Sequence, residues 1–145
     1  MIYKDFDNET EARIFRDKQR EAKLAASLFT YGKDRFRVKV METTDDRNPG
    51  WTQRCLSNQA WQVSQDIKDL TEVKRIIDSQ EFIDCDYESI VFVTKYLNKE
   101  GWFERPKDVI EFFNFPDRSL DKIREMVDTA LKEYEDDWND KDGVV

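Results

Sequence analysis

The sequence predicts a mainly helical α+β fold, a bundle of about five to six helices with one small β-hairpin near residues 28–42. Three observations predict it. Glycine and proline are scarce, with 4 Gly and 3 Pro in 145 residues, which gives too few turns for a many-stranded sandwich. Residues 35–40 alternate between charged and apolar side chains, as a half-buried strand does. Between Asn48 and Ile83, apolar residues recur in steps of three and four, at Leu56, Ala60, Val63, Ile67, Leu70, Val73 and Ile77.

The long segment that carries this apolar stripe is predicted to begin at Asn48, whose side chain can cap a helix, with Pro49 in the first helical position. Asp69 followed three residues later by Glu72 is typical of a capping box. We therefore expect the helix to break near Lys68 and to restart.

Trp61 lies about 140° away from the apolar stripe on a helical wheel. Two interpretations remain open for it. Either a second element buries the indole, or Trp61 is an exposed aromatic anchor for a partner.

The first helix is predicted to begin at Asn8, with Glu11 in its third position. Its apolar residues share one arc as far as Phe29, and they are Ile14, Phe15, Ala22, Ala25, Ala26 and Phe29. The opposite arc carries four cations, Arg13, Arg16, Arg20 and Lys23. A charged outer face of this kind is also what an ordinary amphipathic surface helix presents.

The hairpin is predicted from the strands Leu28–Tyr31 and Arg35–Met41, with residues 31–34 as the turn. One face of the second strand would carry Arg35, Arg37 and Lys39, and the other face Phe36, Val38 and Val40. Cations beside aromatic rings suit single-stranded nucleic acid. A solvated charged surface is the simpler alternative.

In the C-terminal half, Ser89–Leu97 fits either a helix ending at Gly101 or a β-branched strand, and we favour the helix. A short helix is predicted over Pro106–Phe113 and a long final helix over about Ser119–Trp138. We expect one domain over residues 1–145, with residues 139–145 as a frayed tail.

The residue content argues against an enzyme. The chain has no histidine, which excludes imidazole catalysis and histidine metal sites, and it has no glycine-rich phosphate loop. Cys55 and Cys85 form no CxxC pair and are expected to be reduced thiols. We predict no catalytic residue, no metal and no cofactor. With no secretory signal and no apolar run long enough to span a membrane, we expect a cytoplasmic protein without membrane contact.

Charge is unevenly distributed along the chain, whose net charge is −8. Residues 1–40 carry 10 Lys and Arg against 7 Asp and Glu, whereas residues 111–145 carry 5 against 11. Within the predicted final helix, five acids share one arc, and they are Asp121, Glu125, Asp128, Glu135 and Asp136. Such an arc either binds a basic partner, is simply solvated, or pairs with the basic arc of the first helix.

These patterns predict a non-enzymatic acidic module that binds or inhibits a protein partner with a basic surface. Occupying the basic surface of a nucleic-acid-binding protein, as DNA mimics do, is one form of this function, by analogy of charge pattern only. The first alternative is a nucleic-acid-binding protein that uses Arg13, Arg16, Arg20, Lys23, Arg35, Arg37 and Lys39. The second is an assembly subunit that oligomerises through Trp61 and the apolar stripe.

Overall fold

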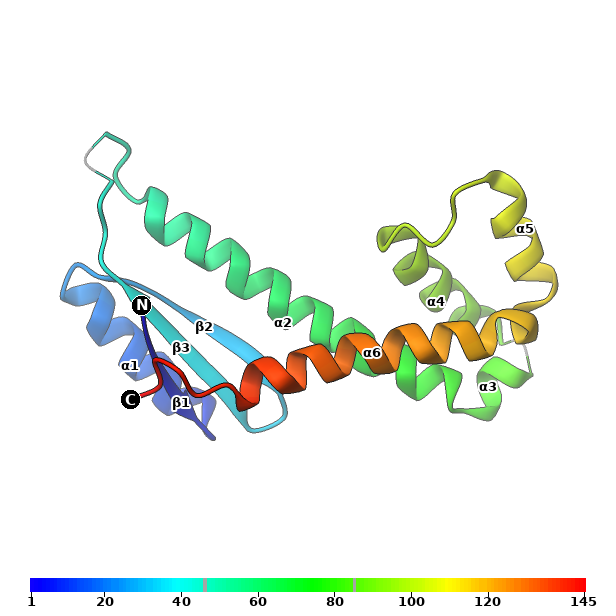
Figure 1. The fold of residues 1–145 in the computed structure, drawn as a ribbon, viewed down its shortest axis with the longest axis horizontal. Helices are drawn as coiled ribbons and strands as arrows, with labels where there is room; N and C mark the ends of the chain where they lie inside the picture. The colour runs from blue at the N-terminus through cyan, green and yellow to red at the C-terminus, as the bar shows by residue number, and fades with distance from the viewer. Residues whose placement is uncertain (46, 85) are drawn as a thin grey trace. The chain divides into compact units, whose positions relative to one another are not determined.

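The computed structural model describes residues 1–45, 47–84 and 86–145 and has the mainly helical α+β fold that the sequence predicts (Figure 1). Its elements in chain order are β1 (Ile2–Phe6), α1 (Glu9–Glu21), β2 (Ala25–Gly32), β3 (Arg35–Met41), α2 (Trp51–Ile77), α3 (Gln80–Ile83), α4 (Tyr87–Lys99), α5 (Pro106–Asn114), the 3₁₀ helix η1 (Pro116–Ser119) and α6 (Leu120–Asn139).

The chain divides into two compact units. Unit 1 contains Met1–Lys68 and Tyr134–Val145, and unit 2 contains Asp69–Glu133. Each unit is described by itself below. The expectation of a single domain over residues 1–145 stays a prediction.

Unit 1 is built on a three-stranded antiparallel sheet in the order β1-β3-β2. The predicted hairpin is present as β2 and β3, but β2 begins at Ala25 and is longer than expected. The first helix was expected to reach Phe29 and instead ends at Glu21. Lys23 adopts a positive φ of 65°, which a helix cannot continue, and the residues that follow it enter the strand.

Both faces of the sheet are covered, by α1 on one side and by α2 on the other (Figure 1). On the first side, Ala12 of α1 packs with Ala26, Val38 and Val40. On the second side, β2 contributes Ala25, Phe29 and Tyr31 to a cluster with α2, whose own members are Leu56, Ala60 and Ile67. A strand buried on both faces has no apolar–polar alternation, which is why the start of β2 resembles a helix in the sequence.

The outer edge of β2 is covered by side chains of α2. The Gln53 side chain accepts a hydrogen bond from the Ala26 amide at 2.9 Å and donates one to the Ala26 carbonyl at 3.0 Å. Farther along, Ser64 Oγ accepts a hydrogen bond from the Thr30 amide at 2.9 Å. These contacts replace part of the backbone pairing that an edge strand lacks.

Helix α2 starts at Trp51 and not at Asn48. The Asn48 carbonyl accepts the Trp51 amide, while the carboxylate of Asp45 accepts the Thr52 amide at 3.4 Å. The side chain of Asn48 accepts a hydrogen bond from Arg54 instead of capping the helix.

The predicted break near Lys68 is absent, because α2 is helical without interruption as far as Ile77. Residues 80–83 form the separate short helix α3, so the long helix ends at Ile77, the last residue of the predicted stripe, and does not reach Ile83.

In unit 2, Ser89–Leu97 is helical as favoured, within α4. The side chain of Asp86 caps α4 by accepting the Ser89 amide at 3.1 Å, and Gly101 follows the helix with a φ of 77°. Phe112 of α5 is buried among aromatic rings, with Phe82 and Phe103 as its neighbours.

The last residues of the chain lie beside β1 in unit 1. The Tyr3 amide donates to the Gly143 carbonyl at 2.7 Å, and the Val145 amide donates to the Tyr3 carbonyl at 2.8 Å. We expected residues 139–145 to fray. They instead add a short parallel bridge to β1, because that edge of the sheet offers backbone groups without a partner strand.

Candidate functional site

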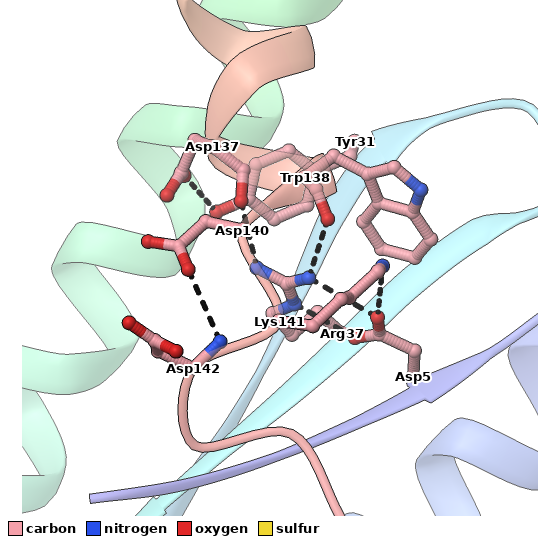
Figure 2. Close-up of polar contacts among 8 residues, drawn as sticks. All are labelled: Asp5, Tyr31, Arg37, Asp137, Trp138, Asp140, Lys141 and Asp142. Carbon is pink, nitrogen blue, oxygen red and sulfur yellow. Dashed lines mark hydrogen bonds and ion pairs between the residues drawn. The ribbon is translucent and has the colours of Figure 1, made fainter.

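The most concentrated set of polar contacts in unit 1 surrounds Arg37, in the middle of β3 (Figure 2). Its side chain is only 1% exposed. Nε and Nη2 bind the two carboxylate oxygens of Asp5 at 2.7 and 3.1 Å, which is the bidentate arrangement that suits a guanidinium. Asp5 comes from β1 and lies directly opposite Arg37 in the sheet register.

The same guanidinium also holds the C-terminal end of α6. Nη1 donates to the Asp137 carbonyl at 3.1 Å, and Nη2 donates to the Trp138 carbonyl at 2.8 Å. The last carbonyls of a helix have no partner within the helix and carry its negative dipole end, so a buried cation stabilises them. Arg37 therefore fastens the end of α6 to the sheet.

Aromatic rings surround this cation. The Arg37 guanidinium carbon lies 4.9 Å from the Trp138 ring centroid, 5.5 Å from that of Tyr31 and 5.6 Å from that of Tyr3. Trp138 and Tyr31 also pack on each other at 5.5 Å between centroids. Ring faces attract a cation that has lost its water, which offsets part of the cost of burying Arg37.

The pKa values of Asp5 and Tyr31 are displaced within this cluster. Burial alone would raise the pKa of Asp5, but hydrogen bonds from Arg37 and from Lys141 Nζ outweigh burial and hold that pKa below its usual value. The Tyr31 hydroxyl donates to the carboxylate of Asp137. Burial, reinforced by this hydrogen bond, raises the pKa of Tyr31. Both groups are held in the protonation state that their hydrogen bonds need.

The other two cations of the β3 face are also engaged. Arg35 pairs with Glu135 of α6, and this contact lowers the pKa of Glu135. Lys39 Nζ lies 4.3 Å from the Phe29 ring centroid, and burial lowers the pKa of this lysine. The three cations of the predicted nucleic-acid face therefore contact aromatic rings and the acidic end of α6, with Arg37 buried and Arg35 and Lys39 partly exposed.

The cations predicted on the first helix are only partly engaged. Arg13 pairs with Glu9 at 2.6 Å, and Arg16 pairs with Asp17 at 3.1 Å. Arg20 Nε donates to the Ala26 carbonyl at 2.9 Å. Lys23 lies beyond the end of α1 in a left-handed conformation, so the four cations do not form one continuous helical arc.

Helix α6 carries the predicted acidic residues, and they differ in their contacts. Asp128 pairs with Lys74 at 2.8 Å within unit 2, and Glu135 pairs with Arg35 within unit 1. Among the described residues, no hydrogen bond or ion pair engages the side chains of the other three, which are exposed: Asp121, Glu125 and Asp136.

Trp61 on α2 is 66% exposed. The interpretation in which a second element buries its indole is therefore wrong. Cys55 is a free, half-buried thiol, and Cys85 lies outside the described residues. Every helix within the described ranges is too short or too polar to cross a bilayer.

Sequence reasoning missed the cluster around Arg37, because its members come from segments far apart in the chain. A weak signal existed in β1, where Tyr3 and Asp5 alternate with Ile2, Lys4 and Phe6. That alternation is typical of a strand, and it places an acid on the same face as the rings. Nothing in the sequence indicated that Asp137 and Trp138 would lie above it.

No protein-family model matches this chain, and comparison with curated proteins and with solved structures finds no match either.

Proposed function

We propose that the protein is a non-enzymatic binding module whose exposed α6 acids engage a protein partner with a basic surface. The observation that supports the proposal most is the state of Asp121 and Glu125 in unit 2. Both are exposed, and neither has a hydrogen bond or ion pair with any described residue. They lie one helical turn apart, about 6 Å, and so present two adjacent free carboxylates on a rigid support.

Two of the other predicted acids of α6 form ion pairs within the chain, which leaves fewer residues for the proposed binding face. Asp128 and Glu135 already have cationic partners, so their charges are partly compensated before any partner arrives. Asp136 is free but belongs to unit 1. We therefore assign the binding contribution chiefly to Asp121 and Glu125.

The nucleic-acid alternative is less well supported at the strand cations. Arg37 is buried and bound to Asp5, Arg35 is bound to Glu135, and Lys39 is packed on rings. Phosphate contacts supply much of the affinity for nucleic acid, and all three cations already have other contacts within the fold. A net charge of −8 also repels a polyanion.

The test uses the full chain, immobilised and exposed to an extract of its native cell. We expect it to retain basic proteins at low salt and to release them as salt is added, because exposed charges are screened. The variant carrying Asp121→Lys and Glu125→Lys should lose this retention while keeping its melting temperature, because neither side chain makes a contact that supports the fold.

The matched control carries Glu21→Lys and Glu42→Lys, which change the net charge equally at exposed positions of unit 1. This control should still retain the partner. Equal retention by the α6 variant and the wild type would overturn the proposal, and so would equal loss in both variants, since that would indicate a response to net charge alone.

A further inference from the structure

The outward side of α2 in unit 1 contrasts with the rest of this acidic chain. Among the described residues 51–68, the exposed side chains include two tryptophans, an arginine and a lysine, but no carboxylate. The only acid in this stretch, Asp66, is half-buried and accepts a hydrogen bond from the Tyr134 hydroxyl at 2.6 Å. We call the exposed surface of residues 51–68 the α2 face.

Trp61 stands near the middle of the α2 face and is 66% exposed. Arg54 and Lys68 lie seven residues before and after it, which places them within about 20° of Trp61 and about 10 Å away along the axis. Neither cation forms an ion pair with a described residue. Tryptophan and arginine are the residues that most often dominate the affinity of a protein interface.

The surface that complements this face in charge is present in the same chain. Unit 2 contains 16 Asp and Glu against 10 Lys and Arg, a net charge of −6. Its free carboxylates include Asp121 and Glu125, and it also exposes aromatic rings, with Phe113 and Phe115 each 43% exposed. Unit 1, by the same count, carries 14 cations against 16 acids.

We infer that the α2 face binds unit 2 of a second copy of this chain, with Trp61 as the apolar anchor and the cations on either side of it, Arg54 and Lys68, facing the acidic surface of unit 2 that includes Asp121 and Glu125. This inference rests on the proposed function, because it uses the same carboxylates of Asp121 and Glu125. The basic partner surface that they bind is then the α2 face of another copy of the protein. Nucleic acid is a poorer occupant of the α2 face, because the whole molecule is acidic.

Such an interface is heterologous, since it joins two different surfaces of identical molecules. A first copy uses its α2 face and leaves its unit 2 unoccupied, so a third copy can add. Association should therefore proceed beyond a dimer as the concentration rises, or close into a ring. Added salt should weaken it, because the opposing charges lie at the exposed rim.

The experiment measures the mass of the full chain by sedimentation velocity over a series of concentrations, at low and at high salt. Wild type should associate at low salt. Trp61→Ala should weaken association about 10-fold or more, because an anchor residue of this kind is worth more than about 1.4 kcal/mol. Trp61 is exposed, so this substitution should leave the circular dichroism spectrum and the melting temperature unchanged.

Two complementary variants give the sharper test. One carries Arg54→Glu and Lys68→Glu and keeps its acidic unit 2. The other carries Asp121→Lys and Glu125→Lys and keeps its α2 face. Each variant alone should stay monomeric, because its two surfaces then carry charges of the same sign, while an equimolar mixture should associate, because the α2 face of one variant again meets a unit 2 of opposite charge on the other.

A monomeric wild type at low salt would overturn this inference, and so would a mixture of the two variants that stays monomeric. If the wild type is monomeric but α6 still retains basic proteins in the capture experiment, only the second-copy inference fails. If the capture also fails, the proposed function fails with it.

Discussion

At the scale of single residues, Arg37 combines burial with more polar contacts than any other side chain in Figure 2. It joins β1 through Asp5, the end of α6 through two carbonyls, and three aromatic rings through its charged face. Because the partners of a buried cation are themselves desolvated, losing the cation leaves them without compensation.

We expect Arg37→Met to lower the free energy of unfolding by about 3 kcal/mol or more, since it leaves the Asp137 and Trp138 carbonyls without their donor and the Asp5 carboxylate with Lys141 alone. Urea denaturation measures this change. Arg13→Met is the control, because Arg13 is exposed and its pair with Glu9 should contribute no more than about 0.5 kcal/mol. Similar losses in the two variants would contradict the role assigned to Arg37.

The pKa of Asp5 predicts how stability responds to acid. Its pKa is lower in the folded chain than in the unfolded chain, so the folded state favours the ionised carboxylate. This contribution is fully present above the unfolded value of about 4 and disappears as the pH falls through the folded value.

We therefore expect the free energy of unfolding to fall as the pH is lowered below about 4, and Asp5→Asn to make that fall shallower. Denaturation curves between about pH 6 and pH 2 test it. Asp7→Asn, two residues along and exposed, should leave the slope as in wild type. An unchanged slope in Asp5→Asn would show that Asp5 does not contribute.

At the scale of elements, Gln53 substitutes for a missing strand at the edge of β2. Its amide both accepts from and donates to the backbone of Ala26, as a neighbouring strand would. Edge strands with free backbone groups are prone to pair with other chains. The packing of α2 on the sheet thus fills an apolar cluster and also protects the strand edge.

Gln53→Ala should destabilise the protein by about 1–3 kcal/mol, because it leaves the buried Ala26 amide without its acceptor, while the Ala26 carbonyl keeps only its hydrogen bond from Arg20. It should also increase aggregation in partly denaturing conditions. Thermal denaturation and light scattering measure the two effects. Gln62→Ala, on the exposed side of the same helix, should change neither. A Gln53→Ala protein as stable as wild type would show that water replaces the lost hydrogen bonds.

Element prediction from the sequence succeeded where one face of a helix or strand is polar. The helical period gave α4, α5 and α6 to within a few residues, and the alternation in β3 gave its two faces correctly. It failed for the first residues of β2, from Ala25 on, because a strand buried on both sides has no period that separates it from a helix. It failed for β1 because five residues are too few for a clear signal.

At the scale of the whole chain, the composition predicted an acidic, mainly helical protein, but it could not predict which charged side chains form ion pairs within the chain. Arg35 and Glu135 lie 100 positions apart in the sequence, and their pairing depends on the path of the entire fold. The free carboxylates of Asp121 and Glu125 became distinguishable from the paired ones only after the partners were known. The sequence therefore predicted five acidic residues as one face of α6, and the structure reduces the acids proposed to bind a partner to Asp121 and Glu125.

The bridge between Tyr3 and Val144 brings the two ends of the polypeptide together in unit 1 (Figure 1). An ideal Cβ on Gly143 would lie 3.4 Å from the Met1 carbonyl oxygen. A linker of a few residues could therefore close the backbone into a ring without crossing the sheet. Opening that ring in the exposed stretch before α2 would yield a circular permutant in which β1 and the C-terminal residues that pair with it become internal.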